Sequence, residues 1–484
     1  IFLNLAMTPT LIITVLIAYF ALLIFISRIT SKEGDNESFF VGKRQSPWYI
    51  VAFGMIGASL SGVTFISVPG WVASSQFSYF QMVLGYLVGY AVIATVLMPL
   101  YYRLNLTSIY TYLEDRFGFW SYKSGAFYFL LSRTIGAAFR LFLVANVLQI
   151  LVFDAWNIPF VVTVALTIAL IWVYTHKAGI RTIIWTDTLQ TLFMLVAVVL
   201  CFYYVADAMD FSLTTAIEQI SLSEYSKTFF FDDVSSASFF PKKFFAGAFL
   251  AIVMTGLDQD MMQKNLSCPS IKDAQKNMFW FSIVLVFVNL LFLGLGALLY
   301  LFATKFGITA TGDDLFATVA MHEQMPIAVG LFFLLGLIAA AYSSADSALT
   351  ALTTSFCVDF LNIEKREESK QVKIRKQTHI LFSVILFIVI LIFKLINDES
   401  VISTLFKVAG YTYGPLLGMY AFGLFTNWRI KDNLIIPVVV LAPILSYVLQ
   451  LMAPIYWGFH FGFELLIVNG ALCFLGMILI KKPN

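Results

Sequence analysis

Long apolar stretches recur along almost the whole chain, and they limit the fold more than any other feature of the sequence. Thirteen of them reach about 20 residues, the length that an α-helix needs to cross a hydrocarbon core of roughly 30 Å. Backbone amides and carbonyls meet no water there, so each stretch must satisfy its hydrogen bonds internally. The sequence therefore predicts an all-α polytopic membrane protein with about 13 transmembrane helices. These helices are expected near residues 9–27, 47–72, 79–102, 124–152, 157–175, 182–206, 244–263, 277–304, 327–360, 378–396, 398–425, 432–452 and 457–480.

Composition excludes a soluble domain. Hydrophobic residues make up 60% and charged residues 12% of the 484 residues, and the mean hydropathy is +0.87. The net charge of +2 gives no reason to expect a nucleic acid as a partner. Because no long linker divides the chain, residues 1–484 are expected to form a single transmembrane domain. Its expected partners are the lipid bilayer and a small-molecule solute, with no obligate protein partner.

The distribution of basic residues predicts the orientation. If the first helix runs from outside to inside, 22 of the 30 Lys and Arg residues fall on the inner side and only five fall outside. Cytoplasmic loops retain Lys and Arg, so we expect a multi-pass plasma membrane protein with its amino end outside and its carboxyl end in the cytoplasm. Three basic residues remain within predicted helices and become candidates for solute binding: Arg133, Arg140 and Lys407.

A polar stripe runs through the predicted helix over 327–360. At about 100° per residue, its polar side chains share one half of the helix surface. They are Ser343, Ser344, Asp346, Ser347, Thr350 and Thr354. Hydroxyl and carboxylate oxygens suit a small hard cation and suit Zn²⁺ or copper poorly. Hydrogen bonding between helices is the alternative. That alternative leaves Asp346 unexplained, because an ionisable residue inside a membrane usually has a function.

Two predicted helices carry breakers in mid-membrane. Gly54, Gly57, Gly62, Pro69 and Gly70 interrupt the second helix, and Gly256 with nearby acidic residues interrupts the seventh. Breaks of this kind free backbone carbonyls to bind an ion or a solute. The two breaks are offset by five helices along the chain, as expected if helices two to six and seven to eleven form inverted repeats.

Four motifs carry a resemblance to a known family. They are SGVTFISVP at 61–69, GIRTIIWTDTLQ at 179–190, AAAYSSADS at 339–347 and AGYTYGP at 409–415. In this order and spacing they resemble the sodium:solute symporter family, which includes bacterial sodium/galactose and sodium/sialic acid transporters.

The resemblance implies a leucine-transporter-like fold. A leading helix at 9–27 would precede repeat one, at about 47–206, and repeat two, at about 244–425, and two trailing helices would occupy about 432–480. The implied function is sodium-coupled secondary active symport, in which a small polar solute enters by alternating access. A sugar, a sugar acid such as sialic acid, a polyol or a small carboxylate would all fit. The implied location is the inner membrane of a bacterium, and no enzymatic activity is expected.

The resemblance also implies sodium as the coupling ion. The principal sodium site would use carbonyls of Gly57, Leu60 and Ala340 and hydroxyls of Ser343 and Ser344. A second site, present in some members, would use Asp187, Ser343, Asp346 and Ser347. Asp346 stands where the sialic acid transporters have a hydroxyl, so a second sodium ion and a bound proton both remain open there.

Solute contacts carry over from the family less directly. The matching positions are Ser59, Ser61, Thr64, Tyr79, Gln81, Arg133, Arg140, Asp258, Gln259 and Lys407. Sialic acid transporters read the substrate carboxylate with an arginine in the fourth helix, and the aligned residue here is Gly136. Arg133 lies one turn before it and Arg140 seven residues beyond Arg133. As an alternative, the basic side chains would only pair with Asp258, Asp260 or Asp346 in a structural network.

Three other function classes are alternatives to sodium-coupled symport. A proton-coupled permease of the same fold would use Asp187 and Asp346 as its relay. A cation channel would need a filter or rings of like groups, and the sequence shows no such repeat. A membrane enzyme would need a nucleophile or metal cluster, but the four histidines lie in loops or at helix ends.

Overall fold

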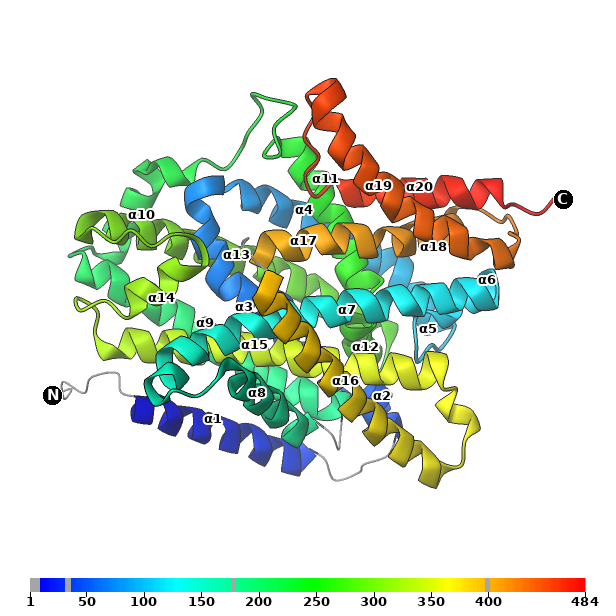
Figure 1. Cartoon of the computed structure of the whole chain (residues 1–484), viewed down its shortest axis with the longest axis horizontal. Helices are drawn as coiled ribbons and strands as arrows, with labels where there is room; N and C mark the ends of the chain where they lie inside the picture. Colours follow the sequence, from blue (N-terminus) through cyan, green and yellow to red (C-terminus); the bar gives the residue numbers. More distant parts are fainter. Residues whose placement is uncertain (1–8, 31–35, 176–178, 397–400, 484) are drawn as a thin grey trace.

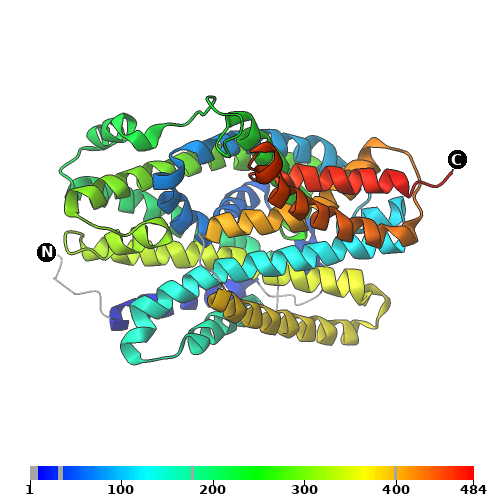
Figure 2. The same cartoon turned by 45° about the horizontal axis from the view of Figure 1, so that its top comes forward.

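The computed structural model describes residues 9–30, 36–175, 179–396 and 401–483. Within these ranges the chain forms helices joined by loops, apart from an isolated β-bridge between Ile430 and Lys481. Most of the long helices lie side by side as a bundle and run roughly along the horizontal in both views (Figure 1 and Figure 2). Helix α1 begins at one end of this bundle and α20 ends at the other.

The first half of the chain supplies ten α-helices. They are α1 (Pro9–Thr30), α2 (Asn36–Val41), α3 (Trp48–Ser75), α4 (Ser78–Val92), α5 (Met98–Arg103), α6 (Thr111–Arg116), α7 (Phe119–Leu148), α8 (Phe160–Thr175), α9 (Ile180–Ala208) and α10 (Leu213–Leu222).

The second half supplies ten more. They are α11 (Phe240–Ala251), α12 (Gln259–Leu266), α13 (Ile271–Phe306), α14 (Leu315–Ala320), α15 (Ile327–Ser355), α16 (Glu368–Ile396), α17 (Val401–Thr412), α18 (Gly414–Phe425), α19 (Ile435–Trp457) and α20 (Leu465–Leu479). π-Helical turns directly follow α4, α7, α11 and α15, at Ile93–Leu97, Gln149–Phe153, Ile252–Gly256 and Phe356–Phe360.

The predicted membrane-spanning character is confirmed. Among the described residues, nine helices are long and apolar enough to cross a bilayer, and the bent pair formed by α11 and α12 would make a tenth. Three shorter apolar helices, α8, α18 and α20, lie where further spans were predicted. The count of 13 spans therefore stays a prediction, as do the limits of the two repeats.

Helices α3 and α15 form the centre of the bundle. Helix α3 packs against α9, α13 and α15, and α15 packs against α3, α7 and α9. In their most apolar windows, 83% of the α3 residues and 72% of the α15 residues are buried, against 22% for α19 at the periphery. The polar stripe thus lies in the protein interior, where a polar group needs a partner because lipid and water are both excluded.

The break in α3 falls at Ser61. Its φ of 52° and ψ of 171° are the only non-helical angles within Trp48–Ser75. A non-glycine residue rarely adopts a positive φ, so packing must hold this conformation in place. The neighbouring Gly62 makes this packing close, because an added Cβ there would lie 2.9 Å from the Cβ of Ala341 on α15. The predicted interruption is confirmed, although the backbone turns at a serine and not at a glycine.

The second break separates α11 from α12. The helix passes through the π-helical turn and bends by 64° before α12 begins. Asp258 is extended, and its carboxylate caps α12 by accepting the backbone N–H groups of Asp260 at 2.9 Å and Met261 at 3.4 Å. A further interruption was not predicted: the expected helix at 398–425 is divided at Tyr413 into α17 and α18.

Candidate functional site

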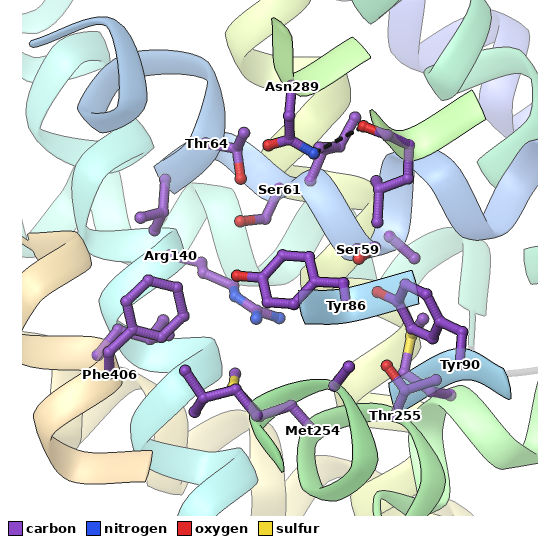
Figure 3. A pocket seen from close by; sticks show the side chains of 18 of the residues that line it. Ser59, Ser61, Thr64, Tyr86, Tyr90, Arg140, Met254, Thr255, Asn289 and Phe406 are labelled. Atoms are coloured by element: carbon purple, nitrogen blue, oxygen red, sulfur yellow. Dashed lines mark hydrogen bonds between the residues drawn. The ribbon is translucent and has the colours of Figure 1, made fainter. Parts of the chain in front are cut away.

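A cavity of about 80 Å³, partly open to the surface, lies beside the breaks in α3 and α11. Residues 58–61, 63 and 64 of α3 and residues 250, 251, 254 and 255 of the α11 segment line it, together with side chains of α4, α7, α12, α13 and α17. Figure 3 shows Ser59, Ser61 and Thr64 on one side of this cavity and Met254 and Thr255 on the opposite side. A concave site that combines apolar surface with a few polar groups is typical of a small-molecule site.

Arg140 of α7 reaches into this cavity with an uncompensated charge (Figure 3). The residue is only 6% exposed, and its Nε and Nη1 atoms are buried without a hydrogen-bond partner. Within the described part of the chain it forms no ion pair. A buried guanidinium without an ion-pair partner is costly, and an anion in the cavity would lower that cost.

Arg133, two turns earlier on α7, differs from Arg140 in its partners. It forms an ion pair with Asp260, and its Nη1 lies 4.0 Å from Oδ2 of Asp258. The hydroxyl of Tyr413 also donates to Asp258. Pairing with Asp258 and Asp260 is the structural alternative that the sequence offered for the basic side chains, and it applies to Arg133. Among the described residues, Arg140 is then the cation of the cavity wall that forms no ion pair.

Several polar residues of the cavity were missed by the sequence analysis. Asn289 of α13 donates its amide to the carbonyl of Leu285 at 2.8 Å, but its Oδ1 is buried without a partner. The hydroxyls of Tyr86, Tyr90 and Thr255 also line the cavity. A signal was present, because Tyr79, Tyr86 and Tyr90 share one face of α4 at helical spacing.

The predicted solute-binding residues divide into two groups. Those that line the cavity are Ser59, Ser61, Thr64, Tyr79, Arg133 and Arg140. The others, Gln81, Asp258, Gln259 and Lys407, are not among its lining residues.

The side chains outside the cavity have different contacts. Gln81 donates to the carbonyls of Ser78 and Ser238, and Gln259 holds the loop before α6 through the carbonyl of Thr107 and the N–H of Ile109. Asp258 caps α12, and Lys407 is exposed at a separate cavity beside α19 and α20. Gln81, Asp258 and Gln259 are therefore engaged in local structural contacts.

Aromatic rings form the wall of the cavity near α17. The rings of Tyr79 and Phe406 stack with centroids 6.5 Å apart, and both residues line the cavity. Trp71 and Phe463 pack behind them, and the ammonium of Lys243 lies 4.8 Å from the Trp71 ring. Lys243 is one of the five basic residues expected on the outer side, yet it is only 6% exposed, because the aromatic rings cover it.

The residues predicted for the principal sodium site are all buried, and they lie on α3 and α15, two helices that pack against each other. The hydroxyl of Ser344 donates to the carbonyl of Ala340 at 3.1 Å, and the hydroxyl of Ser343 donates to Oδ1 of Asp187 at 2.7 Å. Gly57 is held against α9 because its N–H donates to Oγ1 of Thr191 at 3.0 Å. The set of hydroxyl and carbonyl oxygens fits a hard cation such as sodium.

A charged cluster lies next to this position. Asp187 of α9 accepts the hydroxyl of Ser343 and, at 3.4 Å, that of Ser347. Asp346 accepts the hydroxyl of Tyr174 at 2.9 Å and the N–H of Ser347 at 2.6 Å. Every one of these side chains is at most 1% exposed.

Lys264 of α12 completes the cluster and corrects the sequence analysis. Its Nζ lies 2.7 Å from Oδ2 of Asp187, and its side chain is 1% exposed. The count of basic residues had placed it on the inner surface, because it directly follows the predicted helix at 244–263. Arg375, also assigned to the inner surface, is 2% exposed and packs over the ring of Phe39. Lys264 is the chemically most important residue that sequence reasoning missed.

Comparison with known proteins agrees with this geometry. The model of the "Sodium:solute symporter family" matches residues 39–431. The sodium/sialic acid symporter NanT of Aliivibrio fischeri is 24% identical over 422 residues, which cover 84% of this chain and 81% of that protein. The sodium/sialic acid symporter SiaT of Proteus mirabilis is 23% identical over 441 residues, which cover 88% and 87% of the two chains.

A solved structure shows the same fold. The substrate-bound, outward-open state of a Na⁺-coupled sialic acid symporter superimposes with a TM-score of 0.82 at 20% identity, over 97% of this chain and 98% of that one. The leucine-transporter-like fold predicted from the motifs is confirmed, and so is sodium as the coupling ion. Because the family model spans most of its length, the chain belongs to the sodium:solute symporter family and is a membrane transporter that couples a small solute to sodium.

Proposed function

We propose that this symporter imports a small hydroxylated anion, a sugar acid, and that Arg140 holds the carboxylate of that solute. The observation that carries the proposal is the buried guanidinium of Arg140, which faces the cavity without a partner. A carboxylate would satisfy it through two parallel N–H···O bonds, the geometry that arginine favours. A neutral solute would leave the charge buried and uncompensated.

The rest of the cavity supports a hydroxylated solute. The unpartnered Oδ1 of Asn289 is an acceptor for a solute O–H or N–H group. Hydroxyls of Ser59, Thr64 and Tyr86 add groups that both donate and accept. The relatives NanT and SiaT carry the name of sialic acid, which is itself a hydroxylated carboxylate. A sugar acid therefore agrees with both the cavity and the relatives.

We also propose that the principal sodium ion is held by carbonyls of Gly57, Leu60 and Ala340 and by hydroxyls of Ser343 and Ser344. Its position between α3 and α15 would make sodium a bridge between the broken helix and the continuous one. Leu60 also lines the solute cavity, so both ligands would act on the same unwound segment. Loss of sodium on the inner side would then free the two helices to separate and release the solute.

The orientation completes the proposal. In the topology predicted from the sequence, Lys and Arg are in excess on the side of the membrane that holds the carboxyl end, so this side is the cytoplasm. The bacterial relatives support a location in the inner membrane. With this orientation, the inward sodium gradient drives solute import. The predicted proton relay is not proposed, because the family couples its solutes to sodium.

Solute binding by purified protein tests the assignment of Arg140. Thermal-shift titrations in sodium would compare N-acetylneuraminate and glucuronate with neutral glucose and galactose, and we expect only the acids to stabilise the protein. Arg140→Met removes a charged hydrogen-bonding group worth about 1.5 to 3 kcal/mol. The Kd for the acid should therefore rise about 10- to 150-fold.

Two further variants complete the test. Arg140→Lys keeps the charge but loses the planar fork, so it should fall between Arg140→Met and the wild type. Arg103→Met is the matched control, because Arg103 is exposed at the end of α5, away from the cavity. Equal stabilisation by glucose and glucuronate, or an unchanged Kd in Arg140→Met, would refute an anionic solute at this residue.

A further inference from the structure

A lysine side chain lies among the residues predicted for a second sodium site. Ser343 and Ser347 each donate a hydroxyl to the carboxylate of Asp187, so three of the four predicted residues are brought together. Lys264 enters the same group from α12, with its Nζ 2.7 Å from Oδ2 of Asp187. We propose that the ammonium of Lys264 is a tethered cation that takes the place of the second sodium ion, so that the protein binds one sodium per cycle.

Both oxygens of the Asp187 carboxylate already have partners. Its Oδ1 accepts from Ser343, and its Oδ2 accepts from Ser347 and contacts Lys264. A sodium ion bound to the same carboxylate would lie within a few ångströms of the ammonium. Two positive charges that close in a dry interior repel strongly, because little water screens them. Occupancy by Lys264 and by sodium therefore exclude each other.

The charge balance around Asp187 points the same way. Lys264 pairs with this carboxylate, so when both groups are ionised the pair is neutral. A sodium ion added at Asp187 would leave an excess positive charge in the interior. Buried charges are tolerated when they are compensated, so a second ion is disfavoured at this position.

The contact also explains why Lys264 can be buried at all. Helix α12 begins after the 64° bend, and that bend directs the helix toward α15, against which it packs. Gln263, the preceding residue, donates to Oγ1 of Thr354 on α15 at 3.1 Å. The two side chains fasten α12 to the centre of the bundle. Lys264 therefore connects the second broken helix with Ser343 of the proposed principal sodium site through Asp187.

Sodium binding counts test this inference without any solute. Equilibrium binding of radioactive ²²Na⁺ to the purified full chain, at constant ionic strength, should give one sodium ion per wild-type molecule. Lys264→Met removes the ammonium and keeps the side-chain length, so the second position should open and the count should rise to two. Lys272→Met, an exposed substitution of the same kind on α13, should still bind one.

A double variant separates the two roles of the carboxylate. In Lys264→Met/Asp187→Asn both charges are gone, so no buried ion is left unpaired, and the count should return to one. This variant also decides the matter if Lys264→Met alone does not fold. A wild-type count of two, a count of one in folded Lys264→Met, or a count of zero in the double variant would each overturn the inference.

Discussion

Gly57 offers a sharp test of how α3 shapes the principal sodium site. A Cβ added at this position would lie 2.2 Å from Oγ1, 3.2 Å from Cβ and 3.3 Å from Cα of Thr191. The first distance is far below van der Waals contact, so Gly57→Ala must push α3 away from α9. The carbonyls of Gly57 and Leu60 would move with the helix, and both are proposed sodium ligands.

The size of the effect follows from the cost of overpacking. An extra methyl group in a packed core costs about 1 to 3 kcal/mol. If the extra methyl group destabilises the sodium-bound state and not the sodium-free state, the half-saturating sodium concentration should rise about fivefold to 150-fold. Sodium titrations followed by thermal shift or by ²²Na⁺ binding would measure the change.

A compensating substitution makes this test specific. Thr191→Ala removes Oγ1, the atom nearest to the added methyl group, so Gly57→Ala/Thr191→Ala should recover part of the lost affinity. Gly136→Ala is the control, because a Cβ at Gly136 would meet no atom within 4 Å. If Gly57→Ala keeps the wild-type sodium affinity, the site does not depend on the contact between α3 and α9, and the reasoning is wrong.

Four further outcomes are expected. Alanine at both Ser343 and Ser344 should abolish the sodium dependence of solute uptake, and uptake that keeps its full dependence would contradict the proposed site. Gly85→Ala should lower the melting temperature, because its Cβ would lie 2.0 Å from the carbonyl oxygen of Phe244, whereas Gly294→Ala, with its nearest atom at 3.7 Å, should not. Burial raises the pKa of Cys268, in the loop after α12, to about 12. Only the thiolate reacts with maleimide, so a protein whose sole cysteine is Cys268 should be labelled slowly at pH 7 and faster as the pH rises. The control is Lys272→Cys in a protein without other cysteines, whose exposed thiol should react readily at pH 7. Uptake of a monovalent anion with one sodium ion should not respond to membrane potential, whereas a second sodium ion would add about 2.3 kcal/mol per 100 mV.

The sequence by itself determined the class of the protein. Each membrane-spanning helix is a local property, because about 20 apolar residues must form their own hydrogen bonds in lipid. The breaks at Gly57–Gly62 and near Gly256, and the polar face of the helix at 327–360, are also local patterns. They were sufficient to predict a membrane protein with a cation site, and the resemblance of four motifs to a known family added sodium-coupled symport.

Only the tertiary structure decided which charges are paired. Arg133 and Arg140 stand seven residues apart on α7 and look alike in the sequence, but Asp260 of α12 lies against the first alone. In the sequence, Lys264 looks like a loop residue. In the structure, the bend before α12 places it next to Asp187, which is 77 positions away in the chain. The physical reason is that burial and pairing of a charge depend on which helices pack together. The packing of the helices is set by contacts between segments that are distant in the sequence, so it cannot be predicted from the helical periodicity of one segment.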